Sequence, residues 1–359
     1  MIRTKYIKLI VAFAILTLSL TACSNTPKEN TATEQNQNQT GVEEKTHFYY
    51  TANESGSVSK VDAITNEVID TIKEADGAPH NVQVSPDGKV VAYTLAAKMT
   101  KNQSKDGNMD MNMNINGFAV FYDTNTGKLI KKVEVGKHPA HVVFTEDGKY
   151  VLVTNNEDNN VSVIDAKTYK VINTITVGKG PHGFRISKDS KFAYVANMGE
   201  DTISVIDIEN NKEIKKIKVG NTPVTTGITS DGKTLVATVN SENALAIIDL
   251  ATDKVEKVPV DKGPAQVYIE SDDKYAFVAN QGTEEQPSNT VSKIDMATKK
   301  VVATIETGKG AHGVVVRPDN KYVYVTNMYD GTVSVIDNST DKVIKTTKVE
   351  GESNGISYR

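Results

Sequence analysis

The chain has 359 residues, a formal net charge of −4, no tryptophan and one cysteine. A mildly acidic chain argues against nucleic acid or an anionic lipid surface as the main partner, and the shortage of aromatic residues argues against a stacking platform for bases or sugars. A single cysteine excludes an internal disulfide.

The N-terminus has the features of an export signal. Residues 1–22 place Arg3, Lys5 and Lys8 before an apolar run from residue 9 to residue 20. This run is too short for a membrane-spanning helix and is typical of a secretory signal peptide. The sequence Leu20-Thr21-Ala22-Cys23 resembles the bacterial lipoprotein cleavage box. That resemblance implies that Cys23 becomes the lipidated first residue of the mature protein. An ordinary secretory signal is the alternative.

Residues 23–46 are rich in Asn, Gln, Thr and Glu and contain almost nothing apolar. Such a segment cannot bury enough surface to fold, so we expect a disordered tether that follows the lipidated cysteine. Removal of the signal peptide takes away its three positive charges and lowers the formal charge from −4 to −7. The expected location is the cell membrane, lipid-anchored on its extracytoplasmic side.

The rest of the chain is a repeat array. Seven short strand-like runs each end in an apolar residue followed by aspartate, at Asp62, Asp123, Asp165, Asp207, Asp249, Asp295 and Asp337. Four of the six gaps between these aspartates are 42 residues, and the gaps of 61 and 46 each contain a visible loop insertion. A period of this length with several alternating strands per copy is typical of a β-propeller blade. Residues 47–359 are therefore predicted to be an all-β, seven-bladed β-propeller.

The two ends of the array predict how the ring closes. A full copy contains strands a, b, c and d, with the repeated aspartate at the end of strand c. The first copy begins directly with strand b at residues 48–53, whereas residues 354–359 match the start of a blade and then stop. The C-terminus should supply the missing strand a, which gives a three-plus-one closure of the terminal blade without an open sheet edge.

Two of the repeats carry a family resemblance. Tyr194-Val195-Ala196-Asn197 and Tyr324-Val325-Thr326-Asn327, each followed by a loop and Ser-Val-Ile-Asp, resemble the YVTN-repeat (YncE-like) family of seven-bladed propellers. The resemblance covers nearly all of residues 47–359 and implies the fold. Related propellers include the N-terminal domain of nitrous oxide reductase, and the architecture is also similar to that of bacterial lactonases and streptogramin lyases. Fold alone does not transmit an activity.

Histidine collects at one predicted face of the ring. Counting back from the turn between strands a and b gives equivalent channel-mouth positions at His80, Ala140, His182, Val224, Ala265 and His312, with Asn354 in blade one. His138 and His141 flank the position in blade three. His47 is expected on the opposite face. The alternative is that Pro-His-Gly is a structural element of the repeat and that the histidines only cap a turn.

Methionine follows the same pattern. The insertion at residues 98–116, between strands b and c of blade two, contains Met109, Met111 and Met113, while Met198 and Met328 follow strand b in blades four and seven. These three blades also carry the channel-mouth histidines. Imidazole and thioether together suit copper, so the sequence predicts a candidate copper site of His80, His182, His312, His138, His141, Met109, Met111, Met113, Met198 and Met328.

Three function classes stay open. The sequence favours a lipid-anchored binding or scaffold protein for a protein, a polymer or a metal, with no nucleic acid expected. The alternatives are a metal-dependent enzyme of the lactonase or lyase type and a purely structural envelope protein. No catalytic motif selects the enzyme. Arg185 and Arg317 lie on predicted innermost strands, and together with Asn354 they are candidates for binding an anionic ligand.

Overall fold

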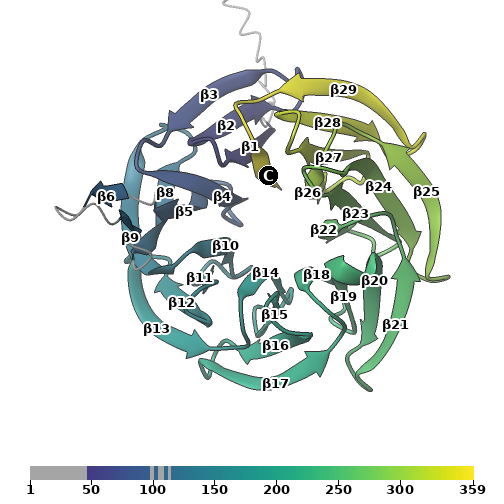
Figure 1. Ribbon diagram of the computed structural model, residues 1–359, viewed down its shortest axis with the longest axis horizontal. Helices are drawn as coiled ribbons and strands as arrows, with labels where there is room; N and C mark the ends of the chain where they lie inside the picture. The colour runs from purple at the N-terminus through teal and green to yellow at the C-terminus, as the bar shows by residue number, and fades with distance from the viewer. Residues whose placement is uncertain (1–46, 98–100, 104–108, 112–114) are drawn as a thin grey trace, which may run out of the picture. The chain divides into compact units, whose positions relative to one another are not determined.

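The structure is a computed structural model that describes residues 47–97, 101–103, 109–111 and 115–359. In this part of the chain, seven four-stranded antiparallel sheets stand around a common axis (Figure 1). The all-β, seven-bladed propeller is thereby confirmed. The predicted signal peptide, the lipidated Cys23 and the tether lie outside the described residues. Among the described residues, no helix is long and apolar enough to span a membrane.

Each blade has strands a to d from the axis outwards. Blade one consists of β30 (Ser353–Tyr358), β1 (Phe48–Asn53), β2 (Ser57–Asp62) and β3 (Val68–Lys73). Blade two consists of β4 (Gly77–Val84), β5 (Val90–Ala97), β8 (Asn116–Asp123) and β9 (Leu129–Lys137). Blade three consists of β10 (Pro139–Phe144), β11 (Tyr150–Asn155), β12 (Asn160–Asp165) and β13 (Lys170–Thr176).

The remaining four blades follow in chain order. Blade four consists of β14 (Pro181–Ile186), β15 (Phe192–Asn197), β16 (Thr202–Asp207) and β17 (Lys212–Lys218). Blade five consists of β18 (Pro223–Ile228), β19 (Thr234–Val239), β20 (Ala244–Asp249) and β21 (Lys254–Pro259), with a 3₁₀ turn at Asn240–Glu242. Blade six consists of β22 (Pro264–Ile269), β23 (Tyr275–Gly282), β24 (Pro287–Asp295) and β25 (Lys300–Glu306). Blade seven consists of β26 (Ala311–Val316), β27 (Tyr322–Asn327), β28 (Thr332–Asp337) and β29 (Lys342–Lys348).

The hydrophobic core is divided among the interfaces between blades. Leu152 and Val163 of blade three pack with Phe184 and Ile206 of blade four, and the other interfaces repeat this arrangement. Strand b lies between two neighbouring blades, so both of its faces are covered. This explains why the b strands are nearly continuous apolar runs, whereas the outermost d strands expose most of their residues.

The ring closes as the sequence predicts. The C-terminal strand β30 pairs antiparallel with β1, with Tyr358 opposite Tyr49 and Ile356 opposite Thr51. All six residues of β30 are buried. The rings of Tyr49 and Tyr358 each lie against Tyr324 of blade seven, with centroids 4.8 and 5.5 Å apart. The C-terminal strand therefore joins blade one to its neighbour as well as completing it.

The repeated aspartates and asparagines fix the turns. Asp123 Oδ1 accepts hydrogen bonds from the backbone N–H groups of Asn125 and Thr126 at 3.0 and 2.7 Å, and each of the other six aspartates accepts the second of these two bonds from its own turn. On the other face, Asn155 Nδ2 at the end of strand b donates to Ser162 Oγ at 2.9 Å. Both residue types thus have a structural role. In the insertion of blade two, β6 (Lys101–Gln103) and β7 (Met109–Met111) pair as a separate two-stranded sheet.

Candidate metal centre

Every innermost strand contains a β-bulge near its start. Two residues of strand a lie opposite a single residue of strand b in all seven blades. The first bulge positions are His80, Ala140, His182, Val224, Ala265, His312 and Asn354, and each second position is the following residue. A bulge breaks the alternation of a strand and re-aims its side chains. His80, His141, His182 and His312 lie in these bulges, whereas His138 precedes β10.

The glycine that follows the bulge histidine has a packing role. A Cβ atom at Gly183, in Pro181-His182-Gly183, would lie 2.8 Å from the backbone oxygen of Val224 in the next blade, and one at Gly313 would lie 2.4 Å from that of Asn354. The threonine opposite the bulge adds a second tie, since Thr154 Oγ1 accepts the backbone N–H of His141 at 2.9 Å and donates to the carbonyl of His182 at 2.7 Å. These contacts account for the glycine and the backbone, and they leave the histidine side chains free for another role.

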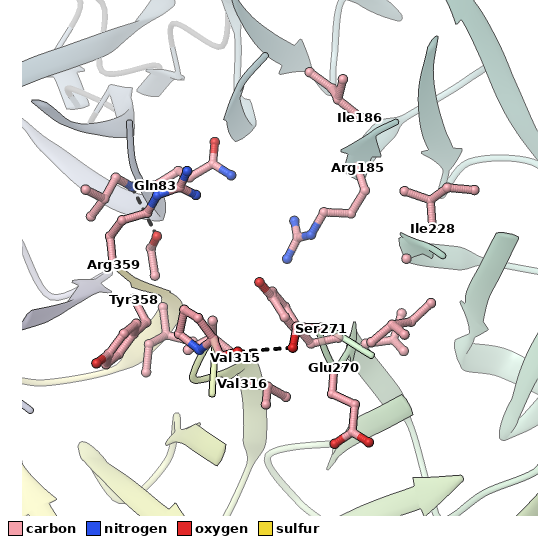
Figure 2. Close-up of a pocket in the computed structure, with 18 of the residues that line it drawn as sticks. Gln83, Arg185, Ile186, Ile228, Glu270, Ser271, Val315, Val316, Tyr358 and Arg359 are labelled. Carbon is pink, nitrogen blue, oxygen red and sulfur yellow. Dashed lines mark hydrogen bonds between the residues drawn. The ribbon is translucent and has the colours of Figure 1, made fainter. Parts of the chain in front are cut away.

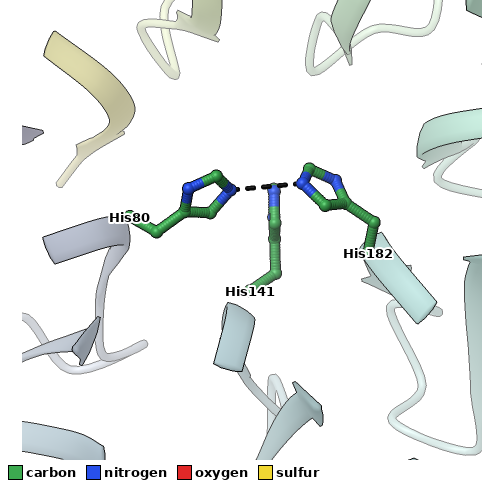
Figure 3. A group of neighbouring side chains, drawn as sticks. All are labelled: His80, His141 and His182. Carbon is green, nitrogen blue, oxygen red and sulfur yellow. Dashed lines mark hydrogen bonds between the residues drawn. The ribbon is translucent and has the colours of Figure 1, made fainter. Parts of the chain in front are cut away.

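Three histidines from consecutive blades converge. Each of the residues His80, His141 and His182 offers one ring nitrogen, and these three nitrogens lie within 4.8 Å of one another. Figure 3 shows the His141 ring between the other two. The Nε2 atoms of His80 and His182 are 3.2 Å apart. Two nitrogens of a tetrahedral metal site are separated by about 3.3 Å, because each lies 2.0–2.1 Å from the ion. The spacing therefore suits a metal ion.

Hydrogen bonds assign the tautomers of His80 and His182. His80 Nδ1 lies 2.5 Å from Glu54 Oε1, and His182 Nδ1 lies 3.2 Å from the backbone oxygen of Val224. Both acceptors place a proton on Nδ1. The two Nε2 atoms are 3.2 Å apart, so a proton or a cation has to lie between them. A proton there makes one of the two rings an imidazolium, whereas a metal ion leaves both rings neutral.

His141 is a buried imidazole without a partner. Its side chain has no exposed surface, and neither of its ring nitrogens makes a hydrogen bond within the described part of the chain. An unsatisfied buried polar group costs about 1–3 kcal/mol. The ring lies 5.0 Å from that of His182 and 6.0 Å from that of His80, measured between centroids.

His141 and His182 are held in the uncharged form. Burial, with repulsion from the neighbouring histidines, holds the pKa of His141 well below its usual range and lowers the pKa of His182 to about 3. Neutral imidazole is the form that binds metals. Glu54 is the charged neighbour. Burial raises the pKa of Glu54, but the hydrogen bond and charge of His80 outweigh that effect and lower it to about 2. A carboxylate behind a ligating histidine is a common feature of metal sites.

His312 and Asn354 stand beside the group of three. His312 is buried, and its Nδ1 lies 3.3 Å from the backbone oxygen of Asn354. Burial and the nearby His80 lower the pKa of His312 to about 4. The group whose ligand atoms converge does not include His312. Asn354 Nδ2 donates to Glu54 Oε1 at 2.8 Å, so the asparagine orients the carboxylate.

The other candidate ligands lie in different surroundings. The side chain of His138 is 52% exposed, and its Nδ1 lies 3.4 Å from Glu157 Oε1. Met198 is exposed, and the sulfur of Met328 accepts a hydrogen bond from Gln281 Nε2 at 3.2 Å. Met109 and Met111 lie in β7, whose side chains are not described, and Met113 is outside the described residues. The structure thus brings together three imidazoles and Glu54.

Glu54 was missed by sequence reasoning. It directly follows the strand-b asparagine of blade one, on the face where strand b meets strand c, and blade one is the neighbour of blade two. This loop lies on the same face as the channel-mouth histidines, so the position of Glu54 in the sequence could have indicated its proximity to them. The position of His141, one residue after the equivalent of His80, required knowledge of the bulge.

The two candidate arginines lie farther along the innermost strands. Both line a cavity of about 330 Å³ that is formed by the later halves of these strands and the turns between strands a and b (Figure 2). Arg185 follows His182 by three residues on β14. Arg317 Nε lies 3.3 Å from Asp319 Oδ2, so its charge has a local partner.

Sequence comparison places the chain among known propellers. The sequence profile of the YNCE-like beta-propeller family matches residues 114–358. No curated protein sequence matches the chain significantly.

Several solved structures have the same fold. A chain of Kuenenia stuttgartiensis hydrazine synthase superposes with a TM-score of 0.67 at 24% identity, covering 80% of this chain and 91% of that one. A functionally unknown protein from Desulfotomaculum acetoxidans gives a TM-score of 0.71 at 15% identity, covering 87% and 98%. The dihydro-heme d1 dehydrogenase NirN, solved in complex with DHE, gives 0.60 at 16% identity, covering 87% and 74%. At these identities the similarity concerns the fold alone.

Proposed function

Since this chain belongs to the YncE-like β-propeller family, we propose that it is an extracytoplasmic binding protein that holds a transition-metal ion between His80, His141 and His182. The family supplies a rigid ring, and the residues in the bulges of that ring decide what is bound. In this chain, three consecutive blades contribute imidazoles to one place.

The observation that carries the proposal is the state of His141. A fully buried imidazole, without a hydrogen-bond partner in the described part of the chain, lies beside two Nε2 atoms that are 3.2 Å apart. A metal ion would satisfy all three nitrogens at once. Depressed pKa values keep His141 and His182 neutral and ready to bind.

The ligand chemistry selects the kind of metal. Three neutral nitrogen ligands suit Cu²⁺, Zn²⁺ or Ni²⁺ and do not suit Mg²⁺ or Ca²⁺, which require oxygen ligands. Among divalent ions, Cu²⁺ should bind most tightly by the Irving–Williams order. Copper is therefore the proposed physiological ion. Methionines of the blade-two insertion would supply a second, softer set of ligands for Cu⁺.

Titration of the metal-free protein with Cu²⁺ and Zn²⁺ tests the proposal. We expect one ion per chain and loss of that binding in the variant His80→Ala, His141→Ala, His182→Ala. The matched control is His47→Ala with His138→Ala, which removes two histidines outside the group and should bind the ion like the wild type. Equal affinities of the two variants for Cu²⁺ would refute the site.

The proposed location is the outer side of the cytoplasmic membrane, anchored through Cys23. Support comes from the sequence Leu20-Thr21-Ala22-Cys23 and from the polar segment that follows it. In the native host, the wild type should fractionate with membranes, and Cys23→Ala should be released into the soluble fraction or stay unprocessed. Recovery of the wild type as a soluble, unlipidated protein would overturn the anchor.

A metal-dependent enzyme is the second candidate. Three protein ligands leave a tetrahedral ion with one open position, which is the arrangement of catalytic zinc sites. The metal would activate a bound water there. Turnover of lactone substrates by the zinc-loaded protein, lost in His141→Ala, would support this function over simple binding. Absence of turnover in a protein that binds the ion would exclude it for those substrates.

A further inference from the structure

Arg185 carries a charge inside the cavity without an acidic partner in the described part of the chain. Its Nη1 donates to the backbone oxygen of Phe184 at 3.1 Å, and its guanidinium lies 5.6 Å from the ring centre of Tyr268. Figure 2 shows the guanidinium extending into the open centre of the cavity. Arg185 is half-buried, and burial lowers its pKa.

Most other charged groups that line the cavity are already engaged, whereas Lys188, which has no partner in the described part of the chain, is exposed to solvent. Arg317 pairs with Asp319, and Arg359 Nη2 lies 3.7 Å from Glu146 Oε2 and 2.9 Å from the backbone oxygen of Pro86. Asp273 accepts the backbone N–H of Ser230 at 2.9 Å.

The carboxylate of Glu270 is engaged in hydrogen bonds with neighbouring residues. It accepts hydrogen bonds from Asn338 Nδ2 at 3.0 Å and from the backbone N–H of Tyr275 at 3.1 Å, and burial raises its pKa to about 7. None of these acids neutralises Arg185. Arg185 is half-buried and unpaired, so its guanidinium is available to an anion from outside the chain.

We propose that this cavity binds a small organic monocarboxylate, with the carboxylate on the guanidinium of Arg185 and the apolar part against the aliphatic wall formed by Ile186, Ile228, Val315 and Val316. These residues all line the cavity. A volume of about 330 Å³ lies at the lower end of the range for small-molecule sites. The site is distinct from the histidine group and does not depend on the proposed metal.

Charge and shape favour a carboxylate over a phosphate. The guanidinium of Arg185 balances one negative charge, and Lys188, the other unpaired cation of the lining, is exposed to solvent and would be screened by it. With Nη1 bonded to Phe184, the Nε and Nη2 groups stay free to bind two carboxylate oxygens side by side. Gln83 adds a donor at the wall of the cavity, because its Oε1 accepts the backbone N–H of Phe144 at 2.6 Å and its NH₂ group is left over.

Calorimetric titration of the metal-free protein with hexanoate, in buffer with physiological salt, tests the site. Hexanamide has the same tail without the charge, and inorganic phosphate has the charge without the tail. We expect saturable binding of hexanoate and at least about tenfold weaker binding of the other two probes, since a charge-assisted hydrogen bond contributes more than a neutral one.

Variants locate the binding. Arg185→Gln should lose hexanoate affinity by at least about tenfold, and Arg185→Lys, which keeps the charge but not the planar fork, should fall between Gln and wild type. Arg317→Gln in the same cavity should stay within about threefold of the wild type, because its charge is already paired. His141→Ala should bind hexanoate unchanged, which separates this site from the metal proposal.

Three results would overturn the inference. They are full hexanoate affinity in Arg185→Gln, equal affinity for hexanamide, and tighter binding of phosphate than of hexanoate. Melting midpoints of the variants establish that each is folded. If Arg185→Gln does not fold, Arg185→Lys still tests the site.

Discussion

The same bulge holds different side chains on two sides of the ring. Blades two, three and four present His80, His141 and His182, whereas the bulges of blades five and six present Val224-Thr225 and Ala265-Gln266. Among the described residues, Thr225 Oγ1 and Gln266 Nε2 are also buried without hydrogen-bond partners. A hydroxyl or an amide can be satisfied by one water, but convergent imidazole lone pairs form a ligand set. The repeated blade thus provides the same backbone bulge seven times, and the residues at the bulge positions determine what each blade can bind.

Removal of residues 353–359 should have the largest effect on stability, because it opens the ring of blades that positions both groups of bulges. β30 is buried along its whole length and pairs with β1. Loss of its apolar burial and ladder hydrogen bonds should lower the free energy of unfolding by roughly 4 kcal/mol or more. Urea denaturation measures the change. An unchanged midpoint would mean that the other blades close without this strand.

Acid should destabilise the histidine side selectively. Folding lowers the pKa of His182 to about 3 and of His312 to about 4 from 6.5, so the unfolded chain binds more protons than the folded one in this interval. Stability is therefore complete above pH 6.5 and declines as pH falls toward 4, by up to about 1.4 kcal/mol per pH unit for each histidine.

Urea midpoints of the metal-free protein at pH 7, 6 and 5 measure this slope. Replacement of His80, His141 and His182 by Gln should flatten it, and Thr225→Ala in the opposite bulge should not. If stability depends on pH equally in both variants, groups other than these histidines cause the loss of stability in acid.

Single histidine variants sharpen the boundary of the group. His141→Ala should weaken Cu²⁺ binding by at least about a hundredfold, since it removes one of three ligands. His312→Ala should change the affinity by less than about threefold, because its ring nitrogens lie outside the group. Competition with a chelator of known affinity measures both. The opposite ranking would place the ion at His312.

Glu54→Gln should have the smallest effect. The amide still accepts a hydrogen bond from His80 but no longer carries the charge that supports it. Loss of such a partner typically weakens a metal site by about 10–100-fold, and the conservative replacement should lie near the lower end of that range. Glu157→Gln, beside the exposed His138, is the matched control and should leave the affinity for Cu²⁺ unchanged.

The sequence predicted the parts of this molecule that repeat. The period placed all seven blades, and the incomplete first copy predicted the pairing of β30 with β1. Equivalent positions identified His80, His182 and His312 together. The period also explained the aspartates as turn residues, which their hydrogen bonds confirm.

Residues that depart from the period could not be placed in the same way. His141 enters the group only because a bulge puts two residues opposite Thr154, and no pattern in a single sequence reveals on which side a bulged residue lies. Glu54 reaches His80 from a loop of another blade. The difference between Arg185 and Arg317 depends on a local pairing with Asp319 that requires the three-dimensional turn.

The C-terminal strand sets the order in which this protein can mature. Asn354 on β30 holds Glu54, and Glu54 in turn holds His80, so the surroundings of the histidine group contain residues from both ends of the chain. While the chain is being made, the edge of β1 stays open until residues 353–358 follow. The histidine group therefore acquires its final surroundings only once β30 has paired with β1.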